Sequence, residues 1–488
     1  MDGLARPPDA GGVHGGVADA GGIDGARAGE CSGERREDPQ AASAAAGLSG
    51  PEGEQAARRD GAAFRAWAPS VVALGLVVRV VYATSHRSMR PGGDAFWYHN
   101  VANLVADGRG FVNPLAYLLT GSVQPNADHP PLHSLYLSAL SLVGGRSVYA
   151  HLLAGAVAGT ATVAFVALAA RELAGARAGL VAGALAALYP NLWVWDGLLL
   201  SESTAGAAVA LHVWLVTRYL RAPSWRRLAL VGAAGGLAGL ARAELGLLAL
   251  VAVPLAWRTV PLAVRTRIAW SAAALLGAAV VVAPWSAYNV GRFERPVPLS
   301  TGLGLVLVSA NCDQTWYGPR LGYWDFGCSV AGTSAARPDT AADTSVLDSR
   351  MQRVALEYAA DHPGRLPAVE GARLGRMFGL FRPFQGARLQ GAVEGGEPWI
   401  ALAGVWAWWG LAALGLVGAA AVRRAGLPLL PVGAAVAVMV FTALISYGIA
   451  RFRAPADAAV AVLAGVGIDA LLRRHRRVLP VPGSLLAG

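Results

Sequence analysis

The chain has 488 residues, of which 55% are hydrophobic and 15% charged, with a formal net charge of +10. Soluble globular proteins average about 25% charged residues, so this composition excludes an ordinary soluble enzyme. All 41 basic residues are arginine. Arginine in a membrane protein is expected in cytoplasmic loops, so the positive charge does not indicate nucleic-acid binding. Three cysteines are too few for a disulfide framework or a thiolate metal cluster.

The first 65 residues are rich in Gly, Ala, Asp, Glu and Arg and lack aliphatic periodicity. A segment of this kind cannot bury enough apolar surface to offset the entropy of ordering. We therefore expect residues 1–65 to form a disordered cytoplasmic tail. The start of the chain has no short apolar stretch followed by a cleavage site, so we do not expect a removable signal peptide.

Apolar stretches recur along the rest of the chain. About 20 apolar residues in a helix cross the hydrocarbon core of a bilayer, so the pattern predicts an all-α, polytopic membrane protein with about ten transmembrane helices. The predicted spans are 67–83, 151–170, 179–195, 204–220, 228–241, 245–257, 268–288, 400–422, 428–447 and 454–472.

The arginines orient these spans. If the N-terminal tail is cytoplasmic, the arginine-rich connections all fall on the cytoplasmic side, as the positive-inside rule requires. Both termini are then cytoplasmic. The expected regions are the tail 1–65, a transmembrane module 66–288 with an extracytoplasmic loop 84–146, a large extracytoplasmic segment 289–399, C-terminal spans 400–472 and a cytoplasmic tail 473–488.

The stretch 228–257 allows two interpretations. As a hairpin, each half spans only about 20 Å at 1.5 Å per residue. As one tilted helix, it would place Arg242 and Glu244 at mid-membrane, which is costly, and would invert every later basic loop. We expect two short helices that meet at the outer face.

Arg79, near the outer end of the first span, is expected to snorkel to the interface.

Residues 92–98 lead into an amphipathic helix, which Gly108 and Gly110 end and which we expect on the outer membrane surface. Asp94 stands at the N-terminus of this helix. Two roles are open for it. It can cap the helix by accepting backbone N–H groups, or it can act as a catalytic carboxylate.

Two further pairs of ionisable residues fall on the same outer side. Asp128 and His129 precede two prolines that begin a short apolar helix, a position that suits an anionic ligand, although a loop corner explains it equally well. Asp196 and Glu202 flank a turn between two spans. An ionisable residue this near hydrocarbon indicates a functional site, and this favours Glu202, because Asp196 also fits a solvated turn.

Six short motifs follow one another along residues 68–472. They are Gly93-Asp94 with Tyr98; His129-Pro130-Pro131-Leu132; Leu188-Tyr189-Pro190 leading to Leu200-Ser201-Glu202; Ala241-Arg242-Ala243-Glu244; Pro284-Trp285 with Asn289; and Ala450-Arg451-Phe452-Arg453-Ala454-Pro455. This order resembles the GT-C class of membrane glycosyltransferases. Within it, the chain is similar to family 39, which includes protein O-mannosyltransferases and the aminoarabinose transferase of lipid A.

The resemblance implies an enzyme that moves a sugar from a polyprenyl-phosphate donor to an extracytoplasmic acceptor, which is a protein, a glycolipid or a cell-wall glycan. Membrane lipid is a further partner and nucleic acid is not. The resemblance makes Asp94 the candidate general base. Transfer from a lipid phosphate also needs positive charge near the departing phosphate, which His129, Arg242, Arg451 and Arg453 can supply. Interfacial anchoring is the alternative for the last two.

The resemblance also implies that Asp128 and Glu202 hold a divalent metal ion (Mg, Mn or Zn), as the matching positions do in some family members. The alternative function is a transporter or flippase of lipid-linked sugars or polysaccharide. A transporter normally places ionisable groups near the bilayer midplane, whereas Asp94, Asp128 and Glu202 map to one face.

The large outer segment carries two local expectations. Cys312 and Cys328 are close in the sequence and lie on an oxidising side, so we expect a disulfide between them. Residues 351–384 have helical spacing with a break at 362–364, which predicts two amphipathic helices.

Overall fold

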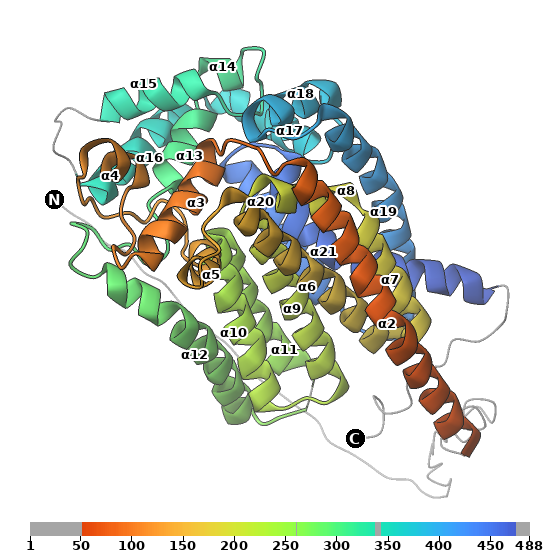
Figure 1. Cartoon of the computed structure of the whole chain (residues 1–488). Coiled ribbons are helices and arrows are strands. Elements are labelled where there is room, and N and C mark those ends of the chain that lie inside the picture. Colours follow the sequence, from red (N-terminus) through yellow and green to blue (C-terminus); the bar gives the residue numbers. More distant parts are fainter. Residues whose placement is uncertain (1–50, 260, 337–342, 475–488) are drawn as a thin grey trace, which may run out of the picture.

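The computed structural model describes residues 51–259, 261–336 and 343–474. Helices joined by loops make up this part of the chain (Figure 1), and an isolated bridge pairs Val112 with Pro125. The all-α prediction is confirmed, and the chain is a polytopic membrane protein.

Five helices are long and apolar enough to cross a membrane. They are α2 (Pro51–Ser85), α6 (Val148–Ala174), α12 (Val264–Asn289), α19 (Pro398–Arg424) and α21 (Ala450–Arg474). A further apolar segment consists of α7 (Ala176–Leu188) followed by α8 (Pro190–Trp193) and η1 (Val194–Leu198), with a 72° bend at the break, and has the geometry of either a broken span or a re-entrant loop. The bend falls at Tyr189 because a residue before proline disfavours the helical conformation.

The other predicted spans coincide with shorter helices. These are α9 (Glu202–Arg221), α10 (Trp225–Ala241), η2 (Ala243–Val251) with α11 (Ala252–Arg258), and α20 (Leu430–Ile445). Length and apolarity alone qualify five or six helices of the described residues. The figure of ten crossings therefore stays a prediction.

The stretch 228–257 is a hairpin, as predicted. Small residues pack directly against the neighbouring backbone: Gly235 against Ala249, Gly239 against Gly246, Gly232 against Ala274, and Gly236 against Ala278. The first two pairs make α10 and η2 antiparallel, and the last two make α10 and α12 parallel. The second half of the hairpin consists of η2 and α11. A 3₁₀ helix rises about 2.0 Å per residue, so these two elements together extend about 28 Å, which is close to the thickness of the hydrocarbon core, about 30 Å.

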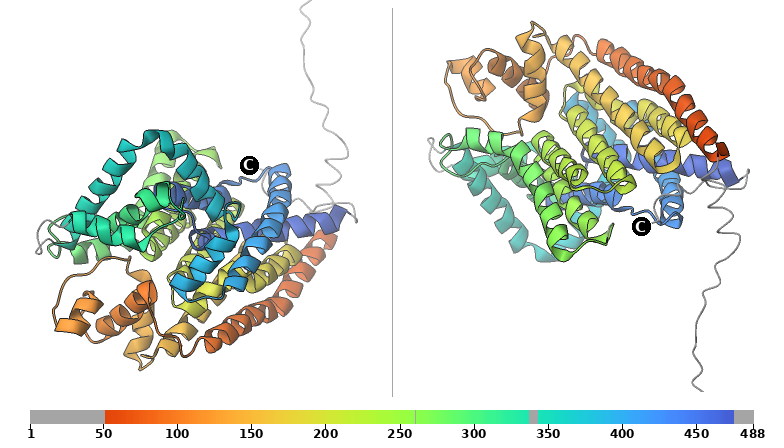
Figure 2. Two further views of the ribbon diagram at one scale, coloured as in Figure 1. Left: turned by 90° about the horizontal axis from the view of Figure 1, so that it is seen from above. Right: turned by 90° about the horizontal axis from the view of Figure 1, so that it is seen from below.

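The helices outside the bundle gather at one of its ends (Figures 1 and 2). The first outer loop contains α3 (Gly93–Ala106), α4 (Pro114–Thr120) and α5 (Leu132–Leu142). The large outer segment contains α13 (Leu303–Ala310), α14 (Asp313–Trp316), α15 (Phe326–Ala336), α16 (Thr344–Asp361), η3 (Pro363–Arg365), α17 (Leu366–Met377) and α18 (Pro383–Glu394). The break predicted at 362–364 is confirmed, and Cys312 is bonded to Cys328.

The predicted disordered tail is wrong for residues 51–65, which form the first turns of α2, while residues 1–50 lie outside the described residues. Two contacts explain the order. Phe64 is buried against α6 and α7, and the Asp60 carboxylate accepts hydrogen bonds from Ala176 N at 3.0 Å, which caps α7. Composition could not reveal contacts to helices more than 100 residues away.

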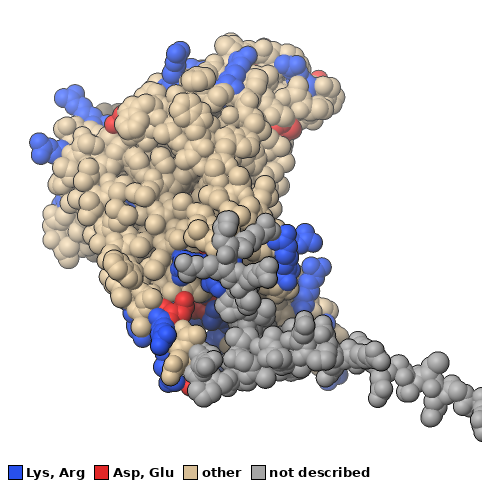
Figure 3. Space-filling model, turned by 90° about the vertical axis from the view of Figure 1, so that its right-hand side faces the viewer, with Lys and Arg blue, Asp and Glu red and all other residues tan. Residues whose placement is uncertain are grey.

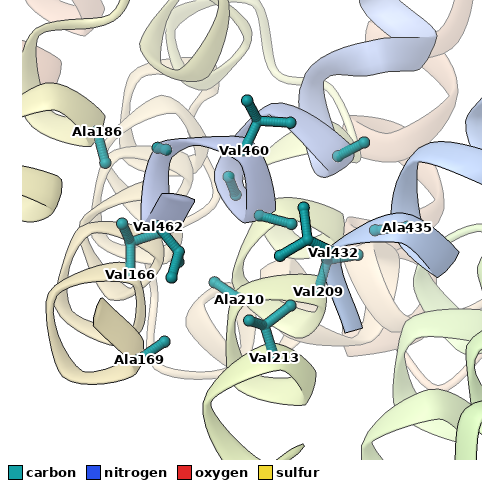
Figure 4. Close-up of a cluster of buried hydrophobic side chains, with 14 of the residues drawn as sticks. Val166, Ala169, Ala186, Val209, Ala210, Val213, Val432, Ala435, Val460 and Val462 are labelled. Carbon is teal, nitrogen blue, oxygen red and sulfur yellow. The ribbon is translucent and has the colours of Figure 1, made fainter. Parts of the chain in front are cut away.

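The core of the bundle surrounds α21, which packs against α6, α7, α9, α19 and α20. Valine and alanine side chains fill this core (Figure 4). Small residues let the backbones approach closely, as at Gly465, which packs directly against Ala182. On the face shown in Figure 3, charged side chains gather at the two ends and the surface between them is almost free of charge, as a membrane-spanning protein requires.

Candidate active site

Asp94 lies in the first turn of α3. The N-cap of α3 is Gly92, and no side chain caps this helix end, so the cap interpretation of Asp94 is wrong. The Asp94 carboxylate faces α21 instead: Oδ2 accepts a hydrogen bond from Arg451 Nη2 at 2.7 Å, and Oδ1 lies 3.7 Å from His129 Nε2. The Asp94 side chain is 35% exposed, so a ligand can reach it.

Arg451, the second residue of α21, connects three parts of the molecule. Its Nη2 donates to Asp94, its Nε donates to Glu202 Oε1 at 2.7 Å, and its Nη1 donates to Glu394 Oε1 at 2.8 Å. The three carboxylates come from α3, α9 and α18. A buried guanidinium group is stable only with partners of this kind, so Arg451 holds the outer helices and the bundle in one arrangement.

Arg242 is the second cation of this group and lies at the turn between α10 and η2. Its Nη1 donates to Glu202 Oε1 at 2.6 Å and its Nε donates to Glu244 Oε1 at 2.7 Å. Its guanidinium lies 5.0 Å from the centre of the Phe452 ring.

The turn before α9 places Leu199 at φ 58°, and non-glycine residues in this conformation cluster at functional sites.

We call this group the Arg451 cluster; it consists of Asp94, Glu202, Glu244, Glu394, Arg242 and Arg451. Four carboxylates face two guanidinium groups in it. Burial by itself would raise the pKa of Asp94, but Arg451 and His129 lower it to about 2. Burial raises the pKa of Glu394, and the neighbouring carboxylates add to this against the pull of Arg451. Asp94 is therefore held ionised, whereas Glu394 takes up a proton more readily.

His129 and Asp128 are neighbours in the sequence but point to different places. The His129 ring lies beside Asp94 and against Tyr98, with ring centres 4.9 Å apart. Asp128 Oδ1 accepts a hydrogen bond from Thr301 Oγ1 at 3.0 Å, and Thr301 N donates to Ala127 O at 2.8 Å. Asp128 therefore fastens the first outer loop to the segment before α13.

The metal site predicted at Asp128 and Glu202 does not fit the geometry. The described residues contain no group of three or more His, Cys, Asp or Glu side chains that could hold a metal ion. Glu202 Oε1 is already neutralised by both arginines of the cluster, and one oxygen of Asp128 is engaged by Thr301. The donor set lacks the converging oxygen ligands that Mg²⁺ or Mn²⁺ prefers.

Arg453 belongs to a different group, although it follows Arg451 by two residues. Its Nε donates to Asp457 Oδ1 at 2.9 Å, its Nη1 to Met377 O at 2.7 Å and its Nη2 to Tyr189 Oη at 3.1 Å. Its side chain is 2% exposed. We call Tyr189, Asn191, Arg453 and Asp457 the Arg453 cluster. The contacts of Arg453 lie inside the bundle and do not include Asp94, and its predicted role in phosphate binding stays a prediction.

Arg79 and Asp196 also differ from expectation. Arg79 Nε lies 2.8 Å from Asp196 Oδ2, and both side chains are fully buried. Arg79 therefore does not snorkel to the interface, and Asp196 is not a solvated turn residue. Gly159 makes room for the pair, because a Cβ there would lie 2.0 Å from Asp196 Oδ2.

A pocket opens beside Arg451 between α17, α18, α19 and the start of α21; we call it the outer-helix pocket. Its polar lining includes Arg376, Arg382, Gln390, Glu394 and Arg451, and its apolar lining includes Ala401 and Val405 of α19. Glu394 was not among the residues predicted from the sequence. The available signal was a single acid at the end of an amphipathic helix, directly before Gly395 and Gly396, and many surface acids share that pattern.

The solved structures that are similar to this chain include two enzymes. The archaeal oligosaccharyltransferase AglB from Archaeoglobus fulgidus, in complex with an inhibitory peptide and a dolichol-phosphate, is 14% identical with a TM-score of 0.47, over 84% of this chain and 52% of that chain. ArnT from Cupriavidus metallidurans, bound to undecaprenyl phosphate, is 17% identical with a TM-score of 0.37, over 83% of this chain and 78% of that chain. This chain thus spans about half the length of the archaeal enzyme.

No curated protein matches this chain. A family model does match, over a segment that runs from the start of the Asp128-His129 motif to the end of α12. That segment includes His129, Glu202 and Arg242 of the site described above. Residues 128–288 match the family described as dolichyl-phosphate-mannose-protein mannosyltransferase, which confirms the resemblance to the GT-C membrane glycosyltransferases.

Proposed function

We propose that this chain is a glycosyltransferase that moves a sugar from a polyprenyl-phosphate carrier to an extracytoplasmic acceptor. One observation carries the proposal: Arg451 joins a partly exposed carboxylate, Asp94, to a pocket whose lining contains both arginines and apolar side chains. The family match at residues 128–288 and the two structures that contain dolichol-phosphate and undecaprenyl phosphate support the carrier class.

The outer-helix pocket suits the head group of such a carrier. Arg376, Arg382 and Arg451 line it with positive charge, and arginine binds phosphate through paired N–H groups. Ala401 and Val405 belong to α19, one of the membrane-spanning helices. A polyprenyl chain can therefore lie along α19 while its phosphate reaches Arg451.

Glu394 occupies one of the Arg451 nitrogens in the donor-free protein. A bound phosphate would compete for that nitrogen, because the Arg451 cluster already has more carboxylates than guanidinium groups. Burial raises the pKa of Glu394, and the two glycines that follow it allow the chain to move. We therefore assign Glu394 as the carboxylate that the donor phosphate displaces.

Displacement also changes Asp94. While Arg451 is fully engaged with it, Asp94 has a pKa of about 2 and is a weak base. A phosphate on Arg451 draws the guanidinium away and lets the pKa of Asp94 rise. Asp94 then accepts the proton of an acceptor hydroxyl as its oxygen bonds to the anomeric carbon. The bond from that carbon to the phosphate oxygen breaks, its electron pair leaves with the polyprenyl phosphate, and the configuration inverts.

We place the site on the extracytoplasmic side and both termini in the cytoplasm. The Cys312–Cys328 disulfide and the arginine-rich connections at the opposite end support this orientation. Thiols introduced at Gly92, Ala243 and Gly386 are expected to react with an impermeant reagent added outside the cell. Thiols at Pro223 and Ala425 are expected to react only after permeabilisation, and outside labelling at Pro223 would overturn the orientation.

A transporter of lipid-linked sugars is the other candidate of this size and span number. Mass analysis of envelope glycans from a deletion strain separates the two. We expect the strain to lose one sugar substituent, wild-type protein to restore it, and Asp94→Asn protein to be inserted in the membrane without restoring it. Restoration by the Asp94→Asn protein would contradict the enzymatic assignment, because a transporter does not need the base.

A further inference from the structure

Three aromatic side chains beside the Arg451 cluster have no part in the steps described above. The Trp324 ring lies 6.4 Å from the Tyr447 ring, and the Tyr447 ring lies 4.9 Å from the Phe452 ring. Phe452 in turn has the Arg242 guanidinium over its face. We call Trp324, Tyr447 and Phe452 the aromatic row. It leads from the outer helices to the arginines of the candidate active site.

The two loops that carry Trp324 and Tyr447 are fixed to each other, and Phe452 lies in α21. Gly448 N donates to Gly322 O at 2.9 Å. A side chain on Gly448 has no room, because its Cβ would lie 1.8 Å from Arg373 O. The buried Arg373 side chain donates to Leu444 O at 2.7 Å and to Ala310 O at 3.1 Å. The row is therefore held in place without a ligand, as a preorganised binding surface requires.

The outer part of the row is not closed by packing. Phe452 is buried, but Trp324 and Tyr447 are only half-buried. Within the described ranges of the chain, no protein group is within hydrogen-bond distance of the Tyr447 hydroxyl, and Tyr447 Oη is not among the buried polar atoms that lack a partner. Burial raises the pKa of Tyr447. The Tyr447 ring is joined to the Arg451 cluster through Phe452, which has the Arg242 guanidinium over its face.

The row also lies outside the outer-helix pocket. The pocket lining includes Tyr323 and the segment from Gly448 to Arg451, but neither Trp324 nor Tyr447. The donor phosphate and the aromatic row therefore meet different surfaces around Arg451. A reaction between a donor and an acceptor needs two such surfaces within reach of one base.

We propose that Trp324 and Tyr447 bind the acceptor and that this acceptor is a carbohydrate. The inference rests on the proposed transfer activity. A sugar ring presents C–H groups on its face, which pack against the electron-rich face of an aromatic ring. Its hydroxyl groups project from the edge, where Tyr447 Oη and Asp94 offer hydrogen-bond partners. An extended peptide would instead need a row of backbone partners, and two aromatic rings do not provide one.

The test uses the purified full-length protein in lipid nanodiscs with a polyprenyl-phosphate sugar donor. Two acceptor probes are compared: neutral oligosaccharides released from the envelope of the source cells, and synthetic peptides that contain Ser and Thr. We expect transfer to oligosaccharides. Trp324→Ala and Tyr447→Ala are expected to raise the KM for the oligosaccharide about tenfold, which corresponds to 1.4 kcal/mol, with the KM for the donor unchanged.

Matched variants separate stacking from folding. Trp324→Phe keeps an aromatic face and is expected to retain most of the affinity, and Tyr447→Phe is expected to fall between wild type and Tyr447→Ala because only the hydroxyl is lost. Tyr317→Ala removes an exposed ring elsewhere on the outer segment and is expected to leave the KM for the oligosaccharide unchanged.

Three results overturn the inference. Transfer to peptides and not to oligosaccharides assigns a polypeptide acceptor. An unchanged KM for the oligosaccharide in Trp324→Ala and Tyr447→Ala shows that the row does not bind it. Binding of polyprenyl phosphate is titrated on the same preparation, so a protein that binds no carrier and transfers to neither probe refutes the proposed function itself, and this inference with it.

Discussion

Arg451 and Arg453 lie two residues apart at the start of α21, yet they belong to clusters of opposite character. Arg451 faces carboxylates from three different elements, one of which is partly exposed and one of which lines a pocket. Arg453 faces Asp457, Tyr189 and a backbone carbonyl inside the bundle. Two residues that are two positions apart on a helix point to nearly opposite sides, since each residue turns the helix by about 100°.

The difference shows what each cluster can do. In the Arg453 cluster, Tyr189 and Asn191 also donate to Asp457, so the charges are satisfied and closed from water. Such a group specifies the packing of α7, α8 and α21. In the Arg451 cluster, carboxylates exceed guanidinium groups and a ligand can enter, so its contacts can be exchanged. The first arrangement suits structure and the second suits binding and chemistry.

Among changes to the Arg451 cluster, Asp94→Asn is expected to have the largest effect on the transfer rate. An amide cannot accept the proton, and loss of a general base typically costs about 10²- to 10⁴-fold in rate. Helix capping is unaffected because Gly92 is the N-cap. The measurement is transfer by purified protein, with Asp107→Asn at the other end of α3 as a matched control. Transfer within about threefold of wild type, far short of the expected loss, would reject the catalytic role.

Arg451→Lys is expected to come next. Lysine keeps one positive charge but cannot reach three carboxylates or grip a phosphate with paired N–H groups. We expect kcat/KM to fall about 10²- to 10³-fold, the usual cost of losing one preorganised electrostatic contact. The melting temperature should also fall, because buried carboxylates lose their partner, so kcat/KM is measured per folded molecule. A kcat/KM close to that of wild type would show that Arg451 does not contact the donor.

Arg453→Met should show the reverse pattern. It leaves Asp457 buried without its cation, and removing one partner of a buried ion pair costs about 3–5 kcal/mol. The transfer rate per folded molecule should stay unchanged. Thermal unfolding and transfer are measured on the same sample, and the double variant Arg453→Met with Asp457→Leu is expected to regain stability. A stable but inactive Arg453→Met protein would return Arg453 to the active site.

Glu394→Gln is expected to have the smallest effect and to improve binding. The variant removes the negative charge that competes with phosphate on Arg451. The affinity for the carrier should therefore rise about tenfold, which corresponds to about 1.4 kcal/mol of binding free energy. In wild type, the pKa of Glu394 is raised, so carrier affinity should increase as the pH falls through that pKa. Glu394→Gln should lose this pH dependence. Weaker carrier binding in the variant would show that Glu394 helps to hold the phosphate.

Much of the fold follows from local patterns in the sequence. Each predicted span falls on helical structure, although 179–195 is broken at Tyr189 and 245–257 consists of η2 and α11. The 228–257 hairpin forms at the expected turn, and the break near residues 362–364 is present. These features depend on apolar length, on proline and glycine, and on the cost of Arg242 and Glu244 in hydrocarbon. The helical residues 51–65 were missed because Asp60 and Phe64 depend on contacts with α6 and α7.

The candidate site divides in the same way. Apolar length and the arginine-rich connections were sufficient to indicate a multi-spanning membrane protein, because hydrophobic transfer and charge placement act residue by residue. The choice of Asp94, His129, Arg242 and Arg451 came from the family resemblance of the motif order. The partners of each charge were decided only by the tertiary structure. It turned Arg453 into the bundle, joined Arg79 to Asp196, and brought Glu394 to Arg451 across 57 positions. An ion pair needs a contact within about 4 Å, and the packing of helices far apart in the sequence, not their local composition, sets that distance.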